Sequence, residues 1–184
     1  MNLDVALKDW HAVCMAIERG RQVVMLRKGG IHETEGRFEI EHRAFLLFPT
    51  WLHQKVDWVK PADREGVAAR ETEPEKIELR GMARVTDIIR VRSRQQVDAI
   101  DDAHIYLPPL IDMRFNYRPE NPLYLLVVRG YALASPITID NTPIYAGCKS
   151  WVPLEAPADV AIAAPALSDA DFEARRQDLL SRMG

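Results

Sequence analysis

The sequence predicts an α+β fold with a mainly antiparallel or barrel-like sheet, short peripheral helices and a C-terminal helix. Short, largely apolar runs rich in β-branched residues, such as 22–26 and 123–133, are typical of buried strands. Apolar residues spaced three and four apart indicate short helices between them. Turns and short helices separate the strands in place of regular crossover helices, which favours antiparallel pairing over a doubly wound parallel sheet.

Composition describes an ordinary globular chain of 184 residues, 47% hydrophobic and 28% charged. We expect one α+β domain over 1–154, with a polar loop or linker at 61–76, followed by an Ala/Pro-rich tether and a helix over 155–184. The net charge is −3 and the pI is near 6.0. Any site for a polyanion must therefore be a local basic patch on a mildly acidic body.

The expected compartment is the cytoplasm. Cys14 and Cys148 are the only cysteines and lack CxxC spacing, so we expect reduced thiols. The N-terminus has no basic region followed by a long apolar core, and no stretch approaches the roughly 20 apolar residues that cross a bilayer. We therefore expect neither secretion nor a membrane segment.

In the first half of the chain, Leu3, Leu7, Trp10, Cys14 and Ile17 predict one amphipathic helix, capped by Asn2 or Asp4 and stopped by Gly20. The elements expected after it are a buried strand at 22–26, a Gly-Gly turn at 28–30, a loop or irregular hairpin at 31–41, a strand at 44–48 and a short helix at 51–59.

In the second half, Ser93 followed by Gln96 resembles a capping box for a short helix, and Ser168 with Asp171 caps the last helix. The two prolines make 106–117 loop-like. The expected strands are 76–91, 123–133, 136–139 and 144–152.

The histidines gather early in the chain. His32, His42 and His53 lie about ten residues apart among several glutamates, and imidazole and carboxylate groups are common metal ligands. No HExxH or HxH spacing occurs, and hydrogen-bonded or solvated histidines explain the pattern more simply, so we assign no metal and the cofactor is unknown.

Cations occur in two settings that suit an anion. Arg27 and Lys28 precede Gly29-Gly30, whose backbone amides can approach a phosphate or carboxylate closely, although a plain hairpin turn explains the same residues and no P-loop is present. The runs 114–118 and 149–151 interleave cations with aromatics that could stack on bases. The alternative is that these aromatics fill the core.

Reactive motifs are scarce. The Asp/Glu-x-Lys arrangement of restriction-type nucleases is missing, and no GxSxG elbow surrounds a serine. Whether the chain is an enzyme is left open.

The segments ALKDW, GRQVVMLRKGGIHE, EHRAFLLFPTWLHQ, VTDIIRV, PLYLLVVRGYAL and AGCKSW resemble the domain of unknown function 1802 (DUF1802) over roughly residues 5–154. That resemblance implies bacterial or archaeal proteins near DNA processing or defence, without an assigned activity. The order of elements is also similar, more loosely, to PUA-like and ASCH-type β-barrels, which implies binding of RNA, modified bases or nucleotides. An insertion at 31–60 departs from that order.

Three functions remain open. The first is a nucleic-acid or nucleotide-binding module in which segments 27–55 and 114–149 meet in one cleft. The second is a hydrolase with Glu33 or His42 as general base and Lys55 steadying negative charge. The third is a structural subunit that docks on a partner protein through the C-terminal helix. The candidate ligand-binding residues are Arg27, Lys28, His32, Glu33, His42, His53, Lys55, Arg114, Tyr117 and Lys149.

Overall fold

The computed structural model describes residues 1–28, 31–34, 37–147 and 149–184, without the side chains of 31–34 and 37–39. Its strands are β1 (Asn2–Trp10), β2 (Val24–Arg27), β3 (Ile31–Thr34), β4 (Arg37–Ile40), β5 (Ala44–Thr50), β6 (Lys76–Val91), β7 (Leu123–Asp140), β8 (Trp151–Asp159) and β9 (Ile162–Pro165). Its α-helices are α1 (His11–Glu18), α2 (Arg94–Asp98), α3 (Pro108–Asn116) and α4 (Asp169–Met183). Four 3-10 turns are η1 (Val56–Trp58), η2 (Pro61–Asp63), η3 (Asp101–Ala103) and η4 (Pro143–Tyr145).

The main sheet confirms the α+β class and its largely antiparallel pairing. Its strand order is β2-β7-β6-β5-β1-β8, with β9 also on β7, and β3 and β4 form a separate hairpin. The β1–β5 pair is parallel, and the other strand pairs of the described chain are antiparallel.

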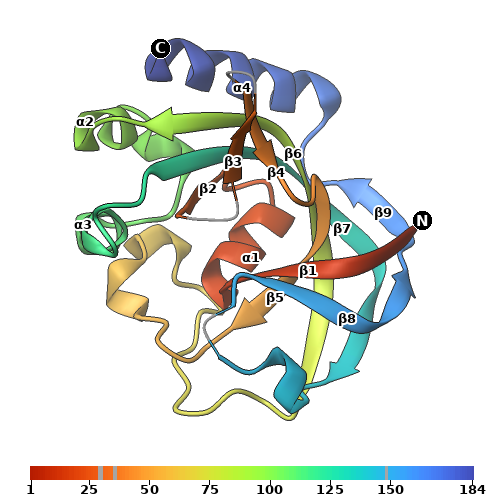
Figure 1. Ribbon diagram of the computed structural model, residues 1–184. Coiled ribbons are helices and arrows are strands. Elements are labelled where there is room, and N and C mark those ends of the chain that lie inside the picture. The colour runs from red at the N-terminus through yellow and green to blue at the C-terminus, as the bar shows by residue number, and fades with distance from the viewer. Residues whose placement is uncertain (29–30, 35–36, 148) are drawn as a thin grey trace.

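One segment curls the sheet toward a barrel. β8 pairs with β1, and after Val160 and Ala161 the chain continues as β9 and pairs with β7. Backbone hydrogen bonds of 2.8 Å, from Val160 N to the Met1 carbonyl and from Ala134 N to the Ala161 carbonyl, continue the pairing through the bend. This segment thus joins two strands that β5 and β6 separate, while β6 and β7 bend across the molecule (Figure 1).

The helix predicted over the N-terminal residues was wrong for residues 2–10, which form β1. Leu3, Val5 and Leu7 recur at every second position, and Leu3 and Leu7 also fit a helical spacing, so periodicity alone cannot separate strand from helix. Pairing with β5 and β8 satisfies the backbone hydrogen-bonding groups on both edges of β1 and therefore stabilises the strand.

Four other expectations were wrong. Residues 108–116 form α3, because prolines in the first turn of a helix lose no intrahelical hydrogen bond. The expected tether after Glu155 is β8 and β9, paired on both sides of its bend. The expected helix at 51–59 is a turn followed by η1, and the expected strand at 144–152 is η4 followed by the start of β8.

The core lies on both faces of the curled sheet. In β5, Phe45 and Leu47 join the larger apolar cluster, whereas Leu46 and Phe48 join the smaller one, as the strand period of two requires. Helix α1 packs on β5, β6 and β7 in the middle of the molecule (Figure 1).

Helix α4 begins at the predicted cap, where Ser168 Oγ accepts a hydrogen bond from Asp171 N. Its apolar residues Phe172, Leu179 and Met183 are buried in the larger cluster. Arg176 and Arg182 form ion pairs with Asp87 and Asp102. The apolar face expected to dock on a partner therefore packs on the chain itself. No helix in the described residues is both long and apolar enough to cross a membrane.

Candidate functional site

The cationic cleft is a cavity of about 650 Å³ where the ends of β1, β2 and β5 meet α3 and the loop before β8. We define it by Lys8, Asp9, Arg27, His53, Arg114 and Lys149. A volume of this size suits a small organic ligand or one nucleotide of a longer chain.

Two arginines and one carboxylate form the floor of the cationic cleft. Arg27 Nη2 donates to Asp9 Oδ2 at 2.9 Å and to the Lys8 carbonyl at 2.7 Å. Arg114 Nη2 lies 3.6 Å from Asp9 Oδ1. Burial lowers the pKa of Arg27 and the Asp9 carboxylate opposes that change, so the guanidinium stays charged at neutral pH. Two guanidinium groups thus share one carboxylate, and one positive charge is left over.

The rim adds lysine and the walls add aromatic surface. Lys149 is exposed, and the described part of the chain offers it no ion pair. Lys8 Nζ donates to the Tyr145 carbonyl. Phe48 and Tyr145 lie with ring centroids 5.4 Å apart and line the cleft together with Trp10. Lys8 Nζ lies 5.5 Å from the Phe48 ring centroid, so a cation and an aromatic ring lie together in this lining.

A carboxylate already occupies one anion-binding feature of the cleft. Trp51 N donates to both Glu73 oxygens, at 3.0 and 3.1 Å, and Leu52 N donates to Oε1 at 2.8 Å. His53 follows with a φ of 69°, in the left-handed region. We call the backbone N–H groups of Trp51 and Leu52 the amide seat. Converging backbone amides of this kind favour anions.

The structure brings together four of the ten candidate ligand-binding residues. Arg27, His53, Arg114 and Lys149 line the cationic cleft, so the two sequence segments do meet there. For His32 and Glu33 the side chains lie outside the described part of the structure, as do Gly29, Gly30 and Cys148.

The other four candidates lie outside the cleft. Lys28 Nζ donates to the carbonyls of Phe115 and Arg118, at 2.7 and 3.1 Å. The remaining three lie against neighbouring side chains. The ring centroids of His42 and Trp151 are 5.3 Å apart. Lys55 Nζ lies 4.1 Å from the Trp58 ring centroid, and Arg118 Cζ lies 5.3 Å from the Tyr117 ring centroid. His42 and Lys55, which the hydrolase hypothesis needs together, pack on different tryptophans.

Sequence reasoning missed Lys8, Asp9, Glu73 and Tyr145. The signal for Asp9 was its position, because in a strand it shares a face with Leu3, Val5 and Leu7 and its carboxylate lies next to the core. The expected helix concealed it. No group of three His, Cys, Asp or Glu side chains within the described residues is arranged to hold a metal ion.

Comparison with known proteins gives a family and distant structural likenesses. The model of the domain of unknown function DUF1802 matches residues 6–178. No curated protein matches the chain. A point mutant of ZmASCH from Zymomonas mobilis is 11% identical, with 96% of each chain covered and a TM-score of 0.48. ASCH from the same organism is 13% identical, with 96% of this chain and 93% of that chain covered and a TM-score of 0.45.

Proposed function

The chain belongs to the DUF1802 family, whose description assigns no function, and we propose from the cationic cleft that the protein is a nucleic-acid or nucleotide-binding module. The observation that carries this proposal is the floor, where Arg27 and Arg114 share the single carboxylate of Asp9. A phosphate would supply the missing negative charge. Such binding would serve DNA processing or defence, the setting that the family resemblance implies.

Local charge supports the proposal. The cleft contains four cationic side chains, Lys8, Arg27, Arg114 and Lys149, against two carboxylates, Asp9 and Glu73, an excess of two positive charges. The whole chain carries −3. The excess of positive charge is therefore local to the cationic cleft. A partly enclosed cleft screens the charge of a bound phosphate less than open water does.

The aromatic wall supports a nucleotide over a simple anion. Phe48, Tyr145 and Trp10 line the cleft together with its cations. A base has a flat apolar face and a phosphate is hydrophilic, so a nucleotide offers one part to the aromatic rings and the other to the cations.

The test is fluorescence anisotropy of labelled single-stranded DNA and RNA oligonucleotides, with mononucleotides as competitors, over a salt series. We expect Arg114→Gln and Lys149→Ala each to weaken binding about five- to tenfold and to lower the salt slope by about one, because each removes one phosphate contact. Arg84→Gln is the matched control, since Arg84 is exposed on β6 outside the cleft. Equal losses in all three variants, or no binding at low salt, would refute the proposal.

A further inference from the structure

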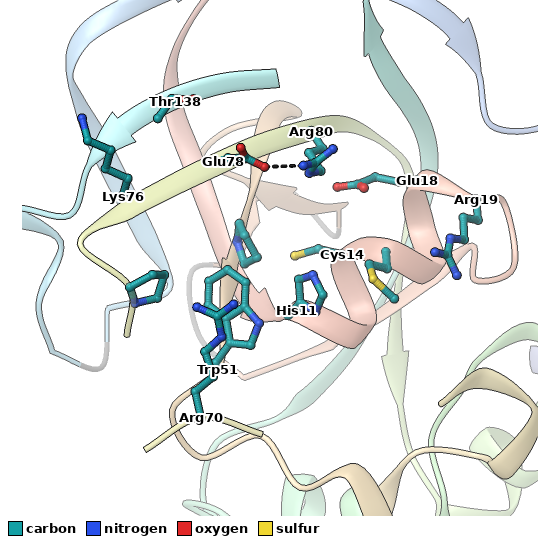
Figure 2. A pocket seen from close by; sticks show the side chains of 13 residues that line it. His11, Cys14, Glu18, Arg19, Trp51, Arg70, Lys76, Glu78, Arg80 and Thr138 are labelled. Atoms are coloured by element: carbon teal, nitrogen blue, oxygen red, sulfur yellow. Dashed lines mark hydrogen bonds and ion pairs between the residues drawn. The ribbon is translucent and has the colours of Figure 1, made fainter. Parts of the chain in front are cut away.

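A second cavity, of about 640 Å³, opens between α1, the end of β5 and the start of β6 (Figure 2). We call it the Glu18 pocket and define it by His11, Glu18, Trp51, Arg70, Lys76 and Arg80. It shares no lining residue with the cationic cleft. The two cavities are neighbours, because Trp51 of this pocket donates its N–H to Glu73 of the cationic cleft.

The carboxyl group of Glu18 is the unusual feature of this pocket. It is half-buried, and within the described part of the chain no hydrogen bond reaches it. The fold makes room for it, because a Cβ on Gly81 would lie 2.4 Å from Glu18 Cγ. A desolvated carboxylate without a partner is costly, and such groups gather at sites that bind ligands.

Two cations act on this carboxyl group, Arg80 and Arg19. Figure 2 shows Glu18 directed toward Arg80, which forms an ion pair with Glu78. Arg70 lies 4.9 Å from the Trp51 ring. Across the pocket there are four cations, Arg19, Arg70, Lys76 and Arg80, against two carboxyl groups, Glu18 and Glu78.

We propose that the Glu18 pocket binds a small hydroxylated organic anion, a hydroxycarboxylate or a sugar ester of phosphate type, and takes up a proton at Glu18 when it does so. Arg70, which lies over the Trp51 ring, binds the anionic group. A ligand hydroxyl forms the hydrogen bond that Glu18 lacks, and Trp51 with its neighbouring prolines bounds the apolar side. The pocket has the volume that a ligand of this size needs.

Glu18 is the group whose charge would control the affinity. Burial raises its pKa to about 7, against the opposing effect of Arg80 and Arg19. Below that value the carboxyl is protonated and the pocket gains one unit of positive charge; above it, the carboxylate repels an anion. A bound anion raises the pKa further, so binding draws in a proton.

Other titratable groups face the pocket from α1, the loop and β6. Burial and nearby arginines lower the pKa of His11, which favours its neutral form. Burial raises the pKa of Cys14, so its thiol stays protonated. The remaining charged side chains that face the pocket are Arg19 on α1, Arg70 in the loop, and Lys76, Glu78 and Arg80 on β6.

Isothermal titration calorimetry of the full chain tests the proposal. Tartrate stands for a hydroxycarboxylate and glucose 6-sulfate for a sugar ester, because neither probe changes charge between pH 6 and pH 8. We expect at least one to bind about five- to tenfold more tightly at pH 6 than at pH 8. Heats in two buffers of different ionisation enthalpy should show proton uptake. The tighter probe identifies the ligand class.

Variants separate this pocket from the cationic cleft. Glu18→Gln should bind at pH 8 as tightly as the unmodified protein at pH 6, with no proton uptake. Arg70→Gln should weaken binding, whereas Glu120→Gln, an exposed carboxylate outside the pocket, and Arg114→Gln should leave it unchanged. Thermal unfolding checks that each variant is folded. Failure of both probes to bind, or a pH dependence that survives in Glu18→Gln, would overturn the proposal.

Discussion

Replacing Asp9 by asparagine should destabilise the protein strongly and strengthen phosphate binding. The side chain of Asp9 is 2% exposed and that of Arg27 is 9% exposed. Asparagine is nearly the same shape and can still accept the 2.8 Å hydrogen bond from Trp10 N, so the substitution removes the charge with little change in packing. It leaves a buried guanidinium without a counter-ion.

The size of the effect follows from burial. Removing one partner of a buried ion pair costs about 3–5 kcal/mol, whereas an exposed pair contributes about 0–1 kcal/mol. Each kcal/mol shifts the Tm of a chain of this length by about 2–4 °C, so Asp9→Asn should lower the Tm by about 6–20 °C. Asp140→Asn is the matched control, because Asp140 pairs with Lys76 at 3.1 Å with both side chains largely exposed.

Thermal unfolding and urea denaturation measure the stability of both variants, and anisotropy below the lowered Tm measures binding. Folded Asp9→Asn should bind oligonucleotide more tightly, because Arg27 and Arg114 lose the carboxylate that they share. A Tm no lower than that of Asp140→Asn would refute the buried ion pair. Lowered stability with unchanged affinity would show that Arg27 and Arg114 do not contribute to ligand binding.

Three further predictions concern the amide seat, the packing of α1 and a buried histidine. Glu73→Ala empties the amide seat, whereas Glu73→Gln removes the same charge but keeps an acceptor there. The alanine variant should therefore bind nucleotide about three- to tenfold more tightly than the glutamine variant. Equal affinities would reject the seat as a phosphate subsite. Gly130→Ala should lower the free energy of unfolding by about 1–3 kcal/mol in urea, because the new Cβ would lie 2.4 Å from the Ile17 carbonyl oxygen, and an unchanged midpoint would contradict that contact. Burial and Lys60 lower the pKa of His104 to about 4, below its ordinary 6.5, so this residue stabilises the fold above pH 6.5 and the contribution is lost as the pH falls toward 4. His104→Gln should therefore show a smaller fall in Tm between pH 7 and pH 5, and an identical fall would contradict the prediction.

The sequence predicted best those elements whose pattern has one interpretation. The runs at 22–26, 44–48 and 123–133 are strands because they are buried on both faces, which leaves no helical alternative of that length. β1 was ambiguous, since Leu3 and Leu7 fit both periods. Its strand state depends on β5 and β8, whose pairing partners lie about 40 to 150 residues away in sequence.

The same non-local pairing explains which site residues were foreseen. Arg27, His53, Arg114 and Lys149 were candidates because cations and histidines near turns suit ligands in many folds. Asp9 becomes a site residue only through the register of β1 on β5, which places Asp9 beside Pro49. Glu73 lies in a polar loop that reads as solvent-exposed, and only the turn at Trp51 gives its carboxylate a partner.

The charge of the cationic cleft depends on which groups its carboxylates bind, and composition does not reveal those partners. Asp9 is divided between two arginines, so it neutralises only one of them. Glu73 is held by uncharged backbone amides, so it compensates no particular cation, and Lys149 faces the cavity without an ion pair in the described residues. A chain with a net charge of −3 can therefore present a positive hollow. If a phosphate displaced Glu73 from the amide seat, it would find both the seat and the surplus cations available.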